Sequence, residues 1–154
     1  MNYLFSILSS NYIDSETIKN DILIAAEKIT PKVDKNEDSY DNVVEIELYN
    51  EDLVDLIRLY VKDKTRFDES KKFNYLRGGT YGELIELAFN IGGPELILVP
   101  FLQEFSKKHP NLLYFTNDGI PRNSPYQVYT AEDIAKFNKN EKFIIASYPS
   151  KRFL

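Results

Sequence analysis

The amino-acid sequence lacks cysteine and tryptophan and contains one methionine and one histidine, His109. Without cysteine, the chain has no disulfide framework, no thiol nucleophile and no cysteine-ligated metal centre. With one histidine, it has no metal site built on two imidazoles, and a serine nucleophile has only His109 as an imidazole base. No Gly-x-Ser-x-Gly turn is present for such a serine. These absences exclude several common classes of catalytic and metal-binding protein.

Long hydrophobic runs are also missing. The longest apolar stretch covers residues 96–102, contains Pro100 and is followed by charge at Glu104, whereas a membrane-spanning helix needs about 20 apolar residues. The apolar run at residues 3–8 has no basic residue before it and no small-residue cleavage site after it. We therefore expect a soluble cytoplasmic protein that has no secretory signal and no membrane partner.

The chain does contain enough apolar material for a single domain spanning residues 1–154. Of these 154 residues, 43% are hydrophobic, including 11 tyrosines and 10 phenylalanines. Charge is unevenly distributed, since residues 1–60 contain 13 acids and 5 bases whereas residues 61–154 contain 11 acids and 14 bases. The net charge of −5 and the isoelectric point near 5.0 argue against a nucleic-acid partner, because binding one requires a clustered basic surface.

Hydrophobic periodicity predicts strands that alternate with helices. We expect strands at residues 3–8, 43–49, 81–91, 112–116, 126–129 and 142–148. We expect a first helix that Asp14 or Ser15 caps, with a buried face of Ile18, Ile22, Ala25, Ala26 and Ile29. Further helices are expected at residues 50–60, 94–108 and 130–137, a polar loop at 32–42 and an irregular segment at 62–80.

Two of these helices depend on particular residues. In the second helix, Asn50 is the cap and the buried stripe is Leu53, Leu56, Ile57 and Tyr60. The third helix contains Pro100, which would kink it. Gly92-Gly93 leaves an alternative open, in which a hairpin turn precedes a strand at residues 95–99 and a shorter helix begins at Pro100. We favour the kinked helix.

The strand at residues 43–49 decides the predicted fold class. Its apolar side chains, Val44, Ile46 and Leu48, point to one side, and Glu45 and Glu47 point to the other. A parallel sheet covered on both faces needs strands that are apolar on both sides. We therefore predict an α+β protein, a two-layer α/β sandwich built on a ferredoxin-like core with additional helices.

The candidate catalytic and phosphate-binding residues have structural explanations. His109 precedes Pro110, where a helix must end, and the helix dipole stabilises an imidazolium there. The glycine-rich segment 77–82 matches neither the phosphate-loop pattern nor Gly-x-Gly-x-x-Gly. Gly92-Gly93-Pro94 opens a helix whose first turn contains Glu95, which would repel a bound phosphate.

The paired carboxylates Glu45 and Glu47 are the remaining candidates for chemistry. No apolar or aromatic residue alternates with them on their strand face to raise the pKa of either group. The nearby set Asp38, Asp41 and Glu45 lacks the spacing of a calcium loop. We therefore predict no enzyme activity, no catalytic residues, no metal site and no cofactor.

The strongest functional signal is a run of carboxylates between residues 34 and 52, in which Lys35 is the only base. Complementary charge accelerates protein association and selects partners. Our first hypothesis is a small acidic binding or inhibitor protein that sequesters a basic partner protein, such as a toxin or nuclease. Its predicted partner-binding residues are Glu37, Asp38, Asp41, Glu45, Glu47, Glu51 and Asp52.

Small, acidic, cysteine-free domains of this kind resemble bacterial immunity proteins in general character. The resemblance implies that the partner is a toxin from a competing cell, toward which the carboxylates mimic nucleic-acid phosphates. The many lysine, asparagine and isoleucine residues suit an AT-rich bacterial or phage source.

Two alternatives remain open. The first is a small-molecule-binding domain, in which arginine forks bind carboxylate or phosphate and tyrosines stack on the ligand, with the residues Tyr75, Arg77, Tyr81, Asp118 and Arg122. The second is a structural module of a larger assembly, in which the charge asymmetry is a solvated surface.

Overall fold

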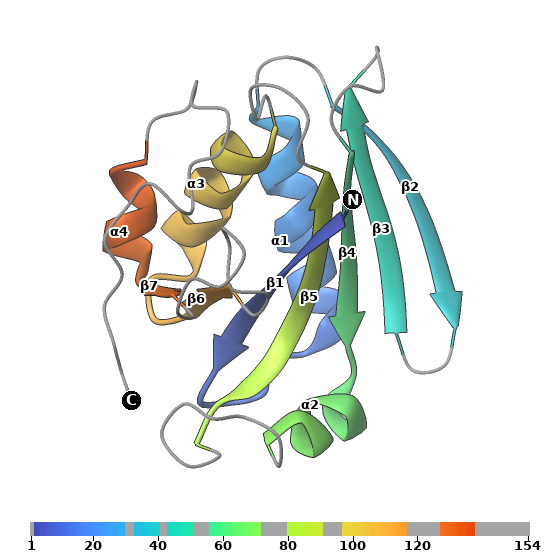
Figure 1. The fold of residues 1–154 in the computed structure, drawn as a ribbon. Coiled ribbons are helices and arrows are strands. Elements are labelled where there is room, and N and C mark those ends of the chain that lie inside the picture. The colour runs from blue at the N-terminus through green and yellow to red at the C-terminus, as the bar shows by residue number, and fades with distance from the viewer. Residues whose placement is uncertain are drawn as a thin grey trace.

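The computed structural model describes residues 2–29, 33–40, 43–50, 56–71, 80–90, 97–116 and 127–137. In these ranges strands and helices alternate irregularly along the chain (Figure 1). Their order is β1 (Asn2–Ser9), α1 (Ser15–Glu27), β2 (Val33–Tyr40), β3 (Val43–Asn50), β4 (Leu56–Lys62), α2 (Lys64–Ser70), β5 (Gly82–Asn90), α3 (Leu98–Lys108), β6 (Leu113–Thr116), β7 (Gln127–Tyr129) and α4 (Ala131–Ala135).

The strands form one 7-stranded sheet in the order β2-β3-β4-β5-β1-β6-β7. Every neighbouring pair is antiparallel. Helix α1 packs against β3, β4 and α3. Helix α4 packs against α3 and β7, whereas α2 lies at one end of the sheet (Figure 1). The mixed α+β class is therefore confirmed. The ferredoxin-like core is not confirmed, because this sheet is larger than the core we predicted.

The side chains that face α1, α3 and α4 form a continuous apolar row across the sheet. Val44 lies opposite Val61, Val61 opposite Ile85, Ile85 opposite Ile7, and Ile7 opposite Tyr114. Residues from all three helices cover this side of the sheet and complete the main core, among them Ile18, Ile22, Ala25, Phe101, Leu102, Phe105 and Ile134. Because successive side chains of a strand point to opposite faces, this core also fixes which side chains point away from it.

Local sequence signals predicted α1 and α4 correctly. Asp14 is the N-cap of α1, where its carboxylate accepts the Glu16 backbone N–H at 3.1 Å. The predicted apolar face of α1 is buried as expected. At α4, Thr130 and Asp133 form a capping box at the start of the helix predicted for residues 130–137. Caps satisfy the unpaired N–H groups of a first helical turn, so these boundaries depend on neighbouring residues alone.

The predicted polar loop at residues 32–42 is wrong, because most of it forms β2. This strand pairs with β3 along its entire length, from Val33 opposite Asn50 to Tyr40 opposite Val43. Its sequence, VDKNEDSY, has no apolar alternation. A strand at the edge of a sheet borders solvent, so hydrogen bonding to one neighbour holds it without an apolar face.

The predicted helix at residues 50–60 is also wrong, because Leu56–Lys62 is strand β4. The apolar spacing fits a helix, but the same segment also alternates with period two. The structure uses the second pattern: Ile57, Leu59 and Val61 are buried, and the side chains between them face the other way. Pairing with β3 on one side and β5 on the other selects the strand.

Helix α3 begins at Leu98, later than the predicted start at Pro94. Its first backbone bond runs from the Phe101 N–H to the Ile97 carbonyl at 2.9 Å. Pro100 therefore lies in the first turn, where a missing N–H costs no helical bond, and the predicted kink has no cause. The alternative start at Pro100 is wrong as well, since Leu98 and Val99 are already helical.

The remaining predicted elements divide into three groups. The strands expected at residues 3–8, 43–49, 81–91, 112–116 and 126–129 are confirmed as β1, β3, β5, β6 and β7. Helix α2 occupies part of the segment predicted to be irregular, and Asp63 caps it by accepting the Arg66 N–H at 2.9 Å. The strand predicted at residues 142–148 lies outside the described residues.

Candidate functional site

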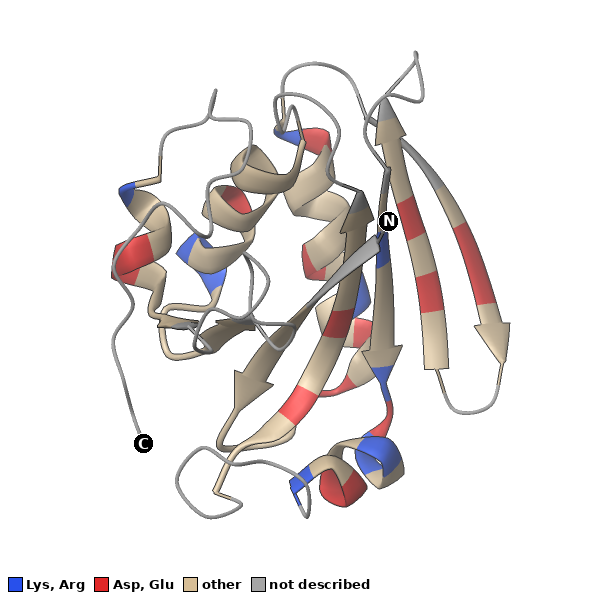
Figure 2. Ribbon diagram, in the orientation of Figure 1, with Lys and Arg blue, Asp and Glu red and all other residues tan. Residues whose placement is uncertain are grey.

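The sheet face opposite α1, α3 and α4 carries a row of mostly polar side chains. Asp38 lies opposite Glu45, Glu45 opposite Tyr60, Tyr60 opposite Glu86, and Glu86 opposite Ser6. Figure 2 shows acidic residues along β2, β3 and β5. We call this side of β2–β5 the acidic face, defined by the carboxylates of Asp38, Glu45, Glu47, Glu83 and Glu86.

One carboxylate of the acidic face is neutralised by the chain itself. Arg58 Nε lies 3.3 Å from Glu47 Oε2, and Asn36 Nδ2 donates to Glu47 Oε1 at 3.5 Å. The hydrogen bond to Glu47 raises the pKa of Arg58. Glu47 therefore adds little negative potential beyond its own pair.

Glu45 lies between two tyrosines. Partial desolvation, and next the hydrogen bond to Glu45, raise the pKa of Tyr40. Desolvation, and next the charge of Glu45, raise the pKa of Tyr60. Both phenols therefore remain protonated at neutral pH and present O–H groups beside a carboxylate. Residues 43–49 alone did not indicate these tyrosines, because the tyrosines come from β2 and β4.

Asp38 and Glu45 form a like-charged pair directly across β2 and β3. Such a pair destabilises a sheet, because the two side chains lie close together. The described ranges contain no ion pair between either carboxylate and a lysine or arginine. No ion pair in the described part of the molecule therefore offsets their mutual repulsion.

Glu83 reaches the acidic face because β5 has an irregularity. Ile7 pairs with Ile85, but the next residue, Leu8, pairs with Glu83, so Leu84 is left between the two pairs. Strict alternation along β5 would place Glu83 on the same side as Ile85. The bulge instead turns Glu83 to the opposite side and lets Leu84 join the main core.

Glu83 is held in a polar contact that is nearly closed to solvent. Ser6 Oγ donates to Glu83 Oε2 at 2.6 Å, and Lys62 Nζ lies 3.8 Å from Glu83 Oε1. Burial raises the pKa of Glu83, and the charge of Glu86 adds to this, while Ser6 and Lys62 act in the opposite direction. Ser6 is only 2% exposed, so it supports the sheet and does not present a nucleophile to solvent.

Glu37 lies on the helix side of the sheet, away from the other predicted partner-binding residues. It stands opposite Ile46, and its Oε1 lies 2.8 Å from Lys19 Nζ on α1. The hydrogen bond to Glu37 raises the pKa of Lys19. The structure thus brings Asp38, Glu45 and Glu47 together and separates Glu37 from them. The other predicted residues, Asp41, Glu51 and Asp52, lie outside the described residues.

The acidic face also contains Glu86, which sequence reasoning missed. Its position on β5 was predicted, but not that β5 lies beside β4 on the same sheet face as Glu45. The signal available was the alternation within residues 81–91, which sets Glu86 opposite in direction to Ile85 and Leu87. What was missing was the strand order.

The alternative small-molecule site is described only at Tyr81. This side chain is partly buried and packs on a second, small apolar cluster with Phe115, beside the buried residues Leu8, Leu113 and Val128. The other residues of that prediction, Tyr75, Arg77, Asp118 and Arg122, lie outside the described residues. Convergence of these side chains on one pocket stays a prediction.

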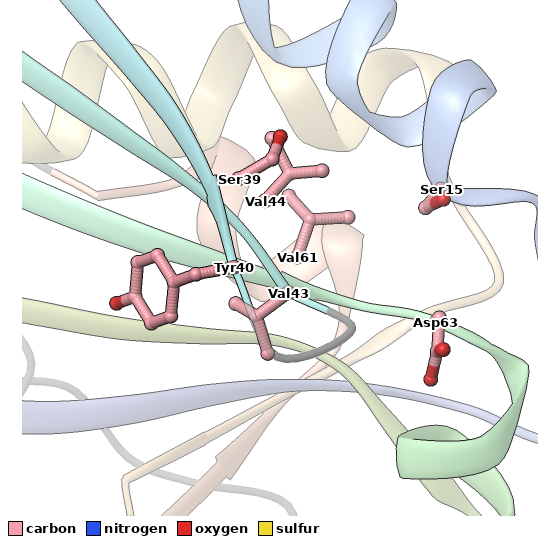
Figure 3. Close-up of a pocket in the computed structure, with 7 residues that line it drawn as sticks. All are labelled: Ser15, Ser39, Tyr40, Val43, Val44, Val61 and Asp63. Carbon is pink, nitrogen blue, oxygen red and sulfur yellow. The ribbon is translucent and has the colours of Figure 1, made fainter.

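A cavity of about 420 Å³ opens near the hairpin end of β2 and β3 (Figure 3). Three valines give it apolar surface, and polar groups come from α1, β2 and the residue that caps α2. Its lining residues are Ser15, Ser39, Tyr40, Val43, Val44, Val61 and Asp63. No sequence motif indicated this cavity, because its walls come from four separate elements.

His109 is the C-cap of α3, as predicted from its place before proline. Its Nε2 lies 2.9 Å from Asp21 Oδ2 on α1, and its ring stacks on Phe105 with centroids 4.7 Å apart. Lys108 Nζ approaches the other oxygen of Asp21 at 3.3 Å. These contacts join α1 to the end of α3, a structural role that explains the residue.

Comparison with family models, with curated proteins and with solved structures found no match to this chain. Among the residues that the structure describes, no group of acidic and histidine side chains is arranged to hold a metal ion. No helix in the described ranges is long and apolar enough to cross a membrane. The functional argument therefore rests on the geometry and charge of the acidic face.

Proposed function

We propose that this protein is a cytoplasmic binding protein that sequesters a basic partner protein through its acidic face. The observation that carries the proposal is the shared cross-strand row of Asp38, Glu45 and Glu86 on the side that α1, α3 and α4 leave uncovered. None of the lysines and arginines in the described ranges forms an ion pair with these three residues. Their potential extends into solvent, where it steers a positive surface toward this face.

Two tyrosines give the same face contact groups besides charge. Tyr40 is 45% exposed, and Tyr60 lies between Glu45 and Glu86. Tyrosine is enriched among the residues that dominate binding energy, because it contributes a large rigid ring and a polar tip. A lysine or arginine that reaches Glu45 can also contact the tyrosine rings, and cation–π contact adds to the ion pair.

A toxin or nuclease fits this face better than a neutral ligand does. Nucleic-acid-binding surfaces are basic because they bind phosphates. Asp38 and Glu45 lie on neighbouring strands, about 4.8 Å apart, and Glu86 lies two strands beyond Glu45, so these carboxylates offer such a surface a substitute for phosphates. By this proposal the protein acts as bacterial immunity proteins do, covering the basic surface of a toxin. Binding, and not catalysis, is its activity.

The test begins with affinity capture by the full chain from cells that make it, followed by purification of the captured protein. The Kd is then measured at about 0.1 M and about 1 M salt, between which the Debye length falls from about 10 Å to about 3 Å. We expect weaker binding at high salt, with the loss mainly in the association rate.

The matched comparison uses two double variants with the same change in net charge. Glu45→Gln/Glu86→Gln alters the acidic face, and Glu27→Gln/Glu69→Gln alters exposed positions on α1 and α2. We expect the first variant to raise the Kd about tenfold, equivalent to about 1.4 kcal/mol, and the second to change it little. Equal effects of the two variants would show that the partner does not bind at this face.

A further inference from the structure

Strand β2 has a free edge in the described part of the molecule. It pairs with β3 along its whole length and with no other described strand, and it lies at one end of the sheet order (Figure 1). In an antiparallel pair, alternate residues turn their N–H and C=O groups away from the partner strand. The edge therefore presents outward-facing backbone groups, and the side chains of residues 36–40 are all exposed. Two backbone N–H groups of β2, those of Glu37 and Ser39, donate to the side-chain oxygens of Asn36 at 3.0 Å and Asp38 at 2.8 Å, and an added strand replaces these local bonds.

This edge lacks the geometric features that usually prevent strand addition. Proteins block free edges with proline, bulges, very short strands or charge. Strand β2 is 8 residues long, contains no proline and pairs with β3 without a register shift. Charge is the remaining feature that can prevent strand addition, and here it excludes some segments and not others. A second copy of the same edge would bring Asp38 near another Asp38, whereas a basic segment meets complementary charge.

We infer that the free edge of β2 accepts an extended basic segment of the partner, which adds to the sheet as a further strand beside β2. The inference rests on the proposed function and specifies how the partner is held. In strand addition, backbone hydrogen bonds provide affinity and alternate side chains provide specificity. Side chains of the added strand on the acidic-face side lie beside Asp38, so lysine or arginine fits there.

Side chains on the other side of the added strand meet the cavity. Ser39 and Tyr40 belong to the edge strand and also line the cavity, together with Val44 and Val61 (Figure 3). The cavity, about 420 Å³ in volume and largely open to solvent, can take a side chain of the added strand. The segment that fits this edge therefore alternates basic residues with apolar ones.

The experiment uses a synthetic peptide as long as β2 that alternates lysine with valine and is capped at both ends. Two further peptides carry N-methyl groups on one or the other set of alternate backbone nitrogens, which removes N–H donors and keeps the charge. We expect methylation of the set that faces β2 to weaken binding to the full chain about tenfold or more, and methylation of the other set to leave it nearly unchanged. Amide hydrogen exchange should slow at alternate residues among 36–40 when the unmodified peptide binds.

Equal affinity of all three peptides, or unchanged exchange along β2, would overturn the inference. If the peptides nevertheless bind the Glu45→Gln/Glu86→Gln variant more weakly than the wild type, the acidic face binds basic segments without strand addition. The proposed function then stands. If the affinity of the purified partner is unchanged by Glu45→Gln/Glu86→Gln, the proposed function fails. The comparison of the two N-methylated peptides then still shows whether a strand adds to β2. Ser39→Phe, which fills the cavity, should weaken the valine peptide several-fold, and unchanged affinity would contradict the role given to the cavity.

Discussion

The contact between Gly82 and Phe67 leaves no space for a methyl group. A Cβ atom at Gly82 would lie 2.5 Å from Phe67 Cε2 and 2.7 Å from Cζ. The ring cannot easily move away, because it is 1% exposed, Tyr12 packs edge-on against it at 5.5 Å, and Lys71 Nζ lies 5.0 Å from its centroid. We predict that Gly82→Ala destabilises the protein by about 2 kcal/mol, in the middle of the range for overpacked cores.

Thermal unfolding measures this effect directly. For a domain of this size, each kcal/mol lowers the Tm by roughly 2–4 °C, so we expect a fall of about 4–8 °C. Urea unfolding should show a lower midpoint with an unchanged slope, because the surface exposed on unfolding is the same.

A double variant distinguishes overpacking from any other cause. Phe67→Leu removes the ring atoms that the new methyl group would meet, at the expense of some buried surface. We therefore expect Phe67→Leu/Gly82→Ala to be no less stable than Phe67→Leu alone, a strong coupling between contacting sites. A wild-type Tm for Gly82→Ala, or a double variant that loses the sum of both single effects, would refute the reasoning.

Three other predictions concern the acidic face and the helix layer. Burial raises the pKa of Glu83 above 4.5, so the folded state binds this proton more tightly than the unfolded state does. The wild type therefore loses stability as pH rises through the raised pKa. Glu83→Gln, which does not titrate, should gain stability relative to the wild type between pH 4 and pH 7, as measured by urea midpoints. Asp38→Asn removes the like-charged pair with Glu45, so the Tm should rise at low salt and the gain should shrink at high salt; no gain at low salt would contradict the repulsion. Gln103 Nε2 donates to the Phe137 carbonyl at 2.9 Å, so Gln103→Leu should cost about 1–3 kcal/mol by leaving buried carbonyls unpaired, and an unchanged chemical denaturation midpoint would rule this out.

Elements whose boundaries depend on nearby residues were predictable from the sequence. The capping side chain of Asp14 and the apolar spacing of α1 act within a few residues, and so does the alternation that separates Ile46 from Glu45. These signals placed α1, β3 and α4, and they set the direction of Glu45 and Glu47 correctly. The directions of two of the five carboxylates of the acidic face were therefore predictable.

The rest depended on contacts between distant segments. Strand β2 is stabilised by pairing with β3, and the choice of strand over helix for β4 is made by neighbours on both sides. Glu83 points to the acidic face because β5 has one extra residue opposite β1, and the hydrophobic pattern of the sequence does not predict such a bulge. Glu37 lies one residue from Asp38 in the chain, yet the sheet sends the two side chains to opposite faces once β2 is a strand.

The position of β1 within the sheet has a consequence for how the chain folds. Strand β1 precedes the other described strands in the chain but lies between β5 and β6, so Phe5 pairs with Leu87 and with Thr116. A growing chain on the ribosome therefore holds an apolar strand without neighbours until most of the sequence has emerged, whereas β2, β3 and β4 can pair as a local meander. Contacts this distant slow folding, so we expect the docking of β1 between β5 and β6 to be a late step.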